Sequence, residues 1–63
     1  MNFDLALSKI LAKGKYTPSE IQALLAEAGC NITMGRLSDY LNRLVVLGVA
    51  AKFSDNTYSS QPY

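Results

Sequence analysis

The sequence predicts one α+β domain over residues 1–63 that is mainly α-helical, with three helices and a C-terminal β-hairpin. Apolar residues recur at intervals of three and four in three segments, which is the spacing of amphipathic helices. Glycines separate those segments, and after the last of them the apolar residues alternate as in a strand. Because 49% of the 63 residues are hydrophobic, the chain can form one small packed core.

The first predicted helix covers Phe3–Lys13 and is followed by Gly14, which favours a helix C-terminus. Asn2 is its expected N-cap. Residues 15–17 are too few for another helix and are expected to be extended. The apolar face of this helix comprises Phe3, Leu7, Ile10 and Leu11.

The second predicted helix begins with a strong capping signal. Thr17 is the expected N-cap, Pro18 occupies the first helical position, and Glu20 falls three residues after the cap, as in a capping box. Gly29 is expected to end the helix. Its apolar stripe comprises Ile21, Leu24, Leu25 and Ala28.

A tight link over residues 29–32 leads to the third predicted helix, which Thr33 caps and which runs to about Leu47. Gly48 is expected to close this helix. Its inward stripe follows the alternating three- and four-residue spacing of a surface helix. The stripe comprises Leu37, Tyr40, Leu41, Leu44 and Leu47.

The predicted hairpin occupies residues 49–63. Residues 54–56 have turn chemistry, because Asp and Asn tolerate the backbone angles of turns. Residues 57–58 are expected to begin the returning strand, and Pro62 makes the last residues an edge strand or a frayed tail. In the first strand, the alternating residues are Val49, Ala51 and Phe53 on one side and Ala50 and Lys52 on the other.

The composition argues against a metal, a disulfide and a membrane span. The chain has no His and a single Cys, Cys30, so it lacks the ligands of a zinc site and cannot form an internal disulfide. Cys30 is expected to be a small half-buried turn residue rather than a redox sensor, because no cationic residue neighbours it. The sequence shows no signal-peptide pattern and no apolar run near about 20 residues, so we expect a cytoplasmic protein.

An enzymatic function is also disfavoured. The sequence holds no Gly-rich phosphate loop and no readable pair of nucleophile and base, and its five acidic residues are spread singly. A chain of this size has little room for an enclosed pocket. We therefore expect neither catalytic residues nor a cofactor.

The order of elements resembles that of winged helix-turn-helix DNA-binding domains. Two helices joined by a short Gly-containing link form a helix-turn-helix element, and a trailing hairpin makes it a winged variant. Residues 17–21 resemble the start of the second helix in such regulators. The end of the third helix resembles their recognition-helix junction, which here comprises Leu44, Leu47, Gly48 and Val49. The resemblance covers nearly the whole chain and extends to the small stand-alone regulators of phages and other mobile elements.

This resemblance implies a sequence-specific transcriptional regulator that binds double-stranded DNA, with the third helix in the major groove and the hairpin as the wing. Arg36 is expected to contact guanine and Asn42 adenine, and Gly35 lets the backbone approach closely. Phosphate contacts are implied for Thr33, Ser38 and Arg43. The full set of implied DNA-binding residues is Thr33, Met34, Gly35, Arg36, Ser38, Asp39, Asn42 and Arg43, with Lys15 added from the extended segment after the first helix and Lys52 from the wing. Because one small module offers little interface, a homodimer or a cooperative assembly is expected.

Some of these residues also suit a purely structural role. Thr33 caps a helix whether or not it contacts DNA. Asp39 and Arg43 lie four residues apart, which suits a surface ion pair. Asp39 carries the wrong charge for a phosphate contact, although its carboxylate can accept a hydrogen bond from cytosine.

A protein-binding module on the same fold is the alternative function. The net charge of +1 lacks the basic excess that DNA-binding proteins usually show. Val45 and Val46 cannot both turn inward, so at least one adds apolar surface near the wing. Under this alternative, Val45 and Val46 are the expected protein interface. A small phage-type inhibitor that acts on host machinery by direct contact belongs to this alternative.

Overall fold

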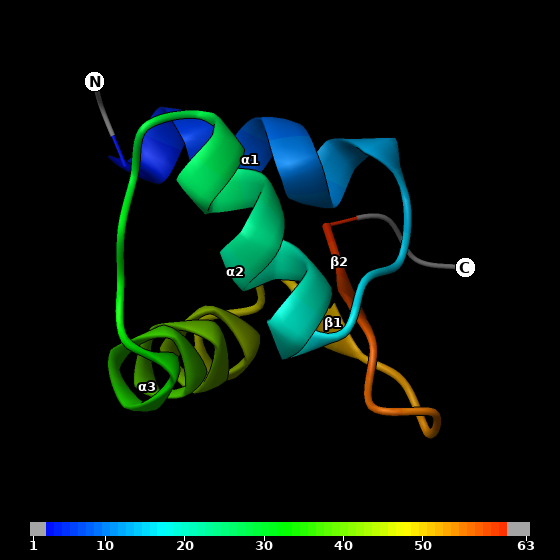
Figure 1. Cartoon of the computed structure of the whole chain (residues 1–63). Coiled ribbons are helices and arrows are strands. Elements are labelled where there is room, and N and C mark those ends of the chain that lie inside the picture. The colour runs from blue at the N-terminus through cyan, green and yellow to red at the C-terminus, as the bar shows by residue number, and fades with distance from the viewer. Residues whose placement is uncertain (1–2, 61–63) are drawn as a thin grey trace.

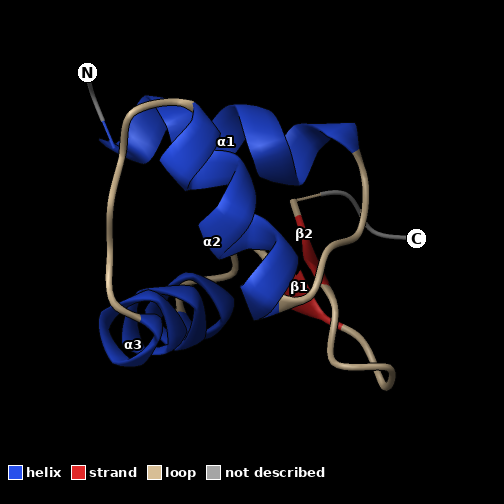
Figure 2. Ribbon diagram, viewed as in Figure 1, coloured by secondary structure: helices blue, strands red, loops and turns tan. Residues whose placement is uncertain are grey.

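The computed structural model describes residues 3–60 of the chain. Within that range, three helices are followed by an antiparallel pair of short strands (Figure 1, Figure 2). The predicted class, α+β and mainly α with a C-terminal hairpin, is confirmed. The elements are α1 (Phe3–Lys13), α2 (Pro18–Glu27), α3 (Met34–Val46), β1 (Ala51–Lys52) and β2 (Tyr58–Ser59).

The core lies where the three helices meet the hairpin. Helix α2 packs against both α1 and α3, and β2 lies against α1. Because the buried side chains are mostly leucine and isoleucine, removal of apolar surface from water is the main force that holds these elements together. The buried apolar residues of the described chain are Ala6, Leu7, Leu11, Ile21, Leu25, Leu37, Leu41, Ala50 and Tyr58.

Both ends of α2 form as predicted. The Thr17 hydroxyl accepts a hydrogen bond from the Glu20 amide, and the Glu20 carboxylate accepts one from the Thr17 amide at 2.9 Å, which completes the capping box. Pro18 occupies the first turn, where a missing amide hydrogen breaks no helical hydrogen bond. Gly29, with a φ of 87°, lets the chain reverse direction after the helix.

Hydrogen bonds hold the link between α2 and α3 to α2. The Cys30 amide donates to a carbonyl near the end of α2 at 2.7 Å. The Gln22 side-chain amide donates to the Ile32 carbonyl at 2.9 Å. Cys30 is half-buried in this link, as predicted. Thr33 then caps α3, as predicted, by accepting a hydrogen bond from the Arg36 amide.

The C-terminal end of α3 differs from the prediction. The helix ends at Val46, and Leu47 is its C-cap residue with 67% of its surface exposed. The expected place of Leu47 in the inward stripe is therefore wrong. Leu47 follows the last helical residue, and the chain reverses immediately afterwards at Gly48, where φ is 79°. The side chain of Leu47 consequently lies in solvent rather than over the core.

Strand β1 starts later than the alternating pattern predicts. The amides of Val49 and Ala50 both donate to the Leu44 carbonyl, at 2.9 and 3.2 Å, so these two residues complete the end of α3. Strand β1 begins only at Ala51 and pairs antiparallel with β2. The turn between the strands contains Asn56 at a φ of 65°, in agreement with the predicted turn chemistry.

Tyr16 adds a further extended segment to the hairpin. Its amide donates to the Tyr58 carbonyl at 3.1 Å, and the Tyr58 amide donates to the Tyr16 carbonyl at 2.8 Å. The prediction that residues 15–17 are extended is thereby confirmed at Tyr16. This pairing ties the hairpin to the segment between α1 and α2 and fixes its position in the fold.

The returning strand is anchored to α1. The Ser59 hydroxyl donates to the Leu11 carbonyl at 3.0 Å, and the Ser60 amide donates to the same oxygen at 3.1 Å. Leu11 lies in the last turn of α1, where carbonyl groups lack helical partners. The expected N-cap Asn2 and the expected edge or tail at residues 61–63 lie outside the described residues.

Candidate nucleic-acid interface

Helix α3 has one buried face and one exposed face. Leu37 and Leu41 point into the core and have no exposed surface. The opposite face lies at the edge of the molecule and is accessible along its length (Figure 1). Residues three and four apart share a face of a helix, so the exposed residues form a continuous strip. They are Gly35, Arg36, Asp39, Asn42, Arg43 and Val46.

Two arginines mark one side of this exposed face. Arg36 and Arg43 are seven residues apart, which places them on the same side of α3 and roughly 10 Å apart along its axis. Asp39 and Asn42 lie between them along the axis. A guanidinium group can bind a phosphate or a guanine edge, and a carboxamide can bind an adenine edge. The fold therefore brings the side chains expected to contact bases onto one accessible surface.

Two of the other expected contact residues, Thr33 and Met34, also serve the fold. The Thr33 hydroxyl accepts a hydrogen bond from the Arg36 amide at 3.4 Å. Met34 is half-buried and packs against the core. Ser38 is also half-buried. These residues lie at the rim of the exposed face, so a contact with DNA at these positions would be peripheral.

Tyr40 links α3 to α1. It was expected in the inward stripe, and its ring is half-buried against Phe3, with the ring centroids 5.0 Å apart and the planes at 82°. The Tyr40 hydroxyl donates a hydrogen bond to the Asp4 carboxylate. This hydrogen bond, together with burial, raises the pKa of the Tyr40 phenol above its ordinary value of 10.0. Tyr40 therefore fixes the orientation of α3 against the start of α1.

A hollow of about 760 Å³ opens beside the start of α3. Arg36 borders both this hollow and the exposed face of α3. The residues that line this hollow are far apart in the sequence, so the spacing of apolar residues could not predict the hollow. The lining residues are Phe3, Gly29, Cys30, Asn31, Ile32, Thr33, Arg36 and Tyr40.

The two lysines expected to bind phosphates, Lys15 and Lys52, both lie over aromatic rings. The ammonium nitrogen of Lys15 is 4.6 Å from the centroid of the Phe53 ring, and that of Lys52 is 5.9 Å from the centroid of the Tyr58 ring. Such cation–π contacts hold a lysine in place while its exposed side stays hydrated. Both residues remain exposed, so their charge can still act on an anionic partner.

A side-chain hydrogen bond stabilises the turn between β1 and β2. The Thr57 hydroxyl donates to the Asp55 carboxylate at 2.6 Å. This hydrogen bond lowers the pKa of Asp55, and the charge of Lys15 acts in the same direction. Strand β1 contacts α3, and the hairpin and α3 lie along the same lower edge of the molecule in Figure 1 and Figure 2.

An apolar surface follows directly after the polar face of α3. We call it the end patch, and it comprises Val46, Leu47 and Val49, which are 85%, 67% and 56% exposed. Val45 is half-buried and packs against the core. The prediction that at least one of the two valines adds apolar surface is confirmed. Sequence reasoning missed Leu47, because its helical spacing assigned it to the core.

Comparison with protein-family models, curated proteins and solved structures finds no match to this chain. Among residues 3–60, no cluster of three or more His, Cys, Asp or Glu side chains could hold a metal ion. In the same part of the chain, no helix is both long and apolar enough to cross a membrane.

Proposed function

We propose that this chain is a winged helix-turn-helix regulator that binds double-stranded DNA with α3 in the major groove. The accessible polar face of α3 supports this proposal most directly. An α-helix with its side chains is about 10–12 Å across, which matches a major groove about 12 Å wide. The hairpin beside α3 would contact a flanking groove or the backbone as a wing.

The exposed residues divide into base-reading and phosphate-binding roles. Arg36 and Asn42 have the donors that read guanine and adenine edges. Arg43, Lys15 and Lys52 would bind phosphate oxygens, which fix the position of the protein without reading sequence. Asp39 would repel phosphates and accept a hydrogen bond from cytosine, so it favours selectivity over affinity.

The small charge of the chain sets the expected strength of binding. With a net charge of +1 and few cationic contacts, one copy would bind DNA weakly. Two copies acting together would multiply the affinity, so we propose a homodimer or a cooperative assembly on the DNA. A regulator of this kind would act in the cytoplasm.

The direct test is a titration of ¹⁵N-labelled protein with a short random duplex, followed by amide chemical shifts. We expect the largest shifts at Gly35, Arg36, Asn42 and Arg43, with smaller ones at Lys52. Shifts confined to α1 and α2 or to the end patch, or no shifts at low salt, would refute the proposal.

The end patch favours a second candidate, in which this fold binds a protein. Three neighbouring apolar residues with more than half of their surface exposed are unusual on a domain this small. In this case Val46→Asp should abolish capture of the partner, whereas Arg36→Ala should have little effect. Under DNA binding the ranking of the two variants is reversed, so the pair of variants separates the two functions.

A further inference from the structure

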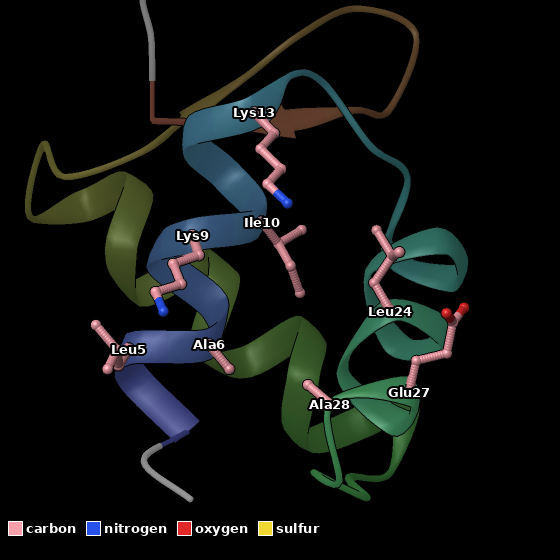
Figure 3. A pocket seen from close by; sticks show the side chains of 8 residues that line it. All are labelled: Leu5, Ala6, Lys9, Ile10, Lys13, Leu24, Glu27 and Ala28. Carbon is pink, nitrogen blue, oxygen red and sulfur yellow. The ribbon is translucent and has the colours of Figure 1, made fainter.

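A second hollow, which we call the groove, lies between α1 and α2. It has a volume of about 360 Å³. Its floor is apolar and its two rims carry opposite charges: Lys9 and Lys13 line the α1 side, and Glu27 lines the α2 side (Figure 3). The apolar lining residues are Leu5, Ala6, Ile10, Leu24 and Ala28.

The apolar lining of this groove is incompletely covered. Leu5 is 53% exposed, and Ile10 and Leu24 are half-buried. Burial of this surface against a partner would be favourable, because each square ångström of apolar surface removed from water contributes about 25 cal/mol. The charged rims would then determine which partner fits.

We propose that this groove binds the same groove of a second copy of the chain, related by a two-fold axis that runs along the groove. Rotation about that axis turns the second groove to face the first and exchanges its rims. The lysine rim of each copy then lies opposite the Glu27 rim of the other. Figure 3 shows Lys9 and Glu27 on opposite sides of the groove at a similar level, so these two side chains form the pair across the interface.

The alternative two-fold axis, lying across the groove, is disfavoured by charge. That rotation leaves each rim on its own side, so Lys9 and Lys13 would face the lysines of the second copy. Like charges placed opposite one another at an interface oppose association. The arrangement of charges on the two rims therefore selects the axis along the groove.

The proposed dimer leaves the exposed face of α3 accessible. In Figure 3, which looks into the groove, α3 lies behind α1 and α2, and its exposed residues point away from the core. The two α3 helices would lie on opposite outer sides of the assembly, so this dimer is distinct from the assembly proposed on DNA. The inference does not depend on DNA binding, and its test requires no DNA.

The size of the chain sets the expected affinity of the dimer. A standard interface covers about 800 Å² of each partner. The whole accessible surface of this chain is 4062 Å². The groove occupies only part of that surface, so we expect dissociation in the micromolar to millimolar range. Sedimentation equilibrium over that range of protein concentration measures this constant directly.

Charge reversal tests the rim pairing. Lys9→Glu alone and Glu27→Lys alone should each weaken the dimer about tenfold, since both symmetric pairs become repulsive. The double variant Lys9→Glu/Glu27→Lys restores opposite charges and should dimerise within about threefold of the wild type. Ser19→Glu, at an exposed position in the first turn of α2 outside the groove lining, should leave the constant unchanged.

Circular dichroism of each variant checks that the helices are retained. Three results would overturn the inference: a wild type that stays monomeric at millimolar concentration, a double variant as weak as the single ones, or a Ser19→Glu variant as weak as Lys9→Glu. Each result can occur whether or not the protein binds DNA.

Discussion

At the scale of single residues, Ser59 is a polar residue that helps to hold the hairpin against α1. Among the described residues it is the one polar residue that is fully buried, and its hydroxyl donates to the Leu11 carbonyl. The sequence around it is polar and suggested an edge or a frayed tail. The hydrogen-bond acceptor that makes this burial possible lies 48 positions away in the sequence. The local sequence around Ser59 therefore could not predict it.

Ser59→Ala should lower the free energy of unfolding by about 0.5–1.5 kcal/mol, which is the usual net contribution of one hydrogen bond. The loss stays moderate because the Ser60 amide still donates to the Leu11 carbonyl. Urea unfolding measures the change. Ser60→Ala is the matched control, since this side chain is exposed and should contribute little. Equal losses for the two variants would contradict the assigned role.

The free energy of unfolding should depend on pH in the alkaline range because of Tyr40. Its pKa is raised above 10.0 in the folded protein, first by the hydrogen bond to Asp4. A raised folded pKa means that the stabilisation is fully present below the unfolded value and is lost as pH rises through the folded value. Wild type should therefore be more stable than Tyr40→Phe at neutral pH, and the difference should vanish above the folded pKa. A difference in unfolding free energy that is constant with pH would contradict this prediction.

At the scale of elements, the helix ends were predictable because their signals are local. The capping box at Thr17 and the left-handed turns at Gly29 and Gly48 involve residues within a few positions of each other. The exposure of Leu47 was not predictable from spacing, because it depends on where the helix stops relative to the core. Periodicity therefore identifies the faces of a helix better than it identifies the last buried residue.

Substitution of Gly35 should change the stability of the fold and its proposed DNA affinity in opposite directions. Its backbone is not left-handed, and no heavy atom lies within 4 Å of an added Cβ. Gly35→Ala should therefore stabilise the fold by about 0.5 kcal/mol through helix propensity. The same methyl group would obstruct close approach to DNA, so DNA affinity should fall. Thermal unfolding and a DNA titration measure the two effects.

Gly48→Ala is the control for Gly35→Ala. At a φ of 79° an added Cβ is strained, so this variant should lose about 1 kcal/mol of stability. Higher stability together with unchanged DNA affinity in Gly35→Ala would contradict the proposed approach of the α3 backbone to DNA.

At the scale of the whole molecule, the class of fold followed from the sequence, but the surfaces did not. The positions of the exposed α3 face were predicted from spacing, since outward positions follow once Leu37 and Leu41 are inward. The groove that joins Lys9 to Glu27 and the stacking of Lys15 on Phe53 arise from contacts between distant segments. Such contacts require the packing angles of the helices, which residue spacing does not specify.

Whether α3 and the hairpin bind DNA is tested by the salt dependence of binding to a labelled random duplex, measured by fluorescence anisotropy. Three cationic phosphate contacts predict that the logarithm of affinity falls with the logarithm of salt concentration with a slope of about −3. Arg43→Ala should reduce that slope by about one. Micromolar binding with this slope would support α3 and the hairpin as a DNA-binding surface. Absence of binding at low salt, or binding that does not respond to salt, would contradict that assignment and favour a protein partner at the end patch.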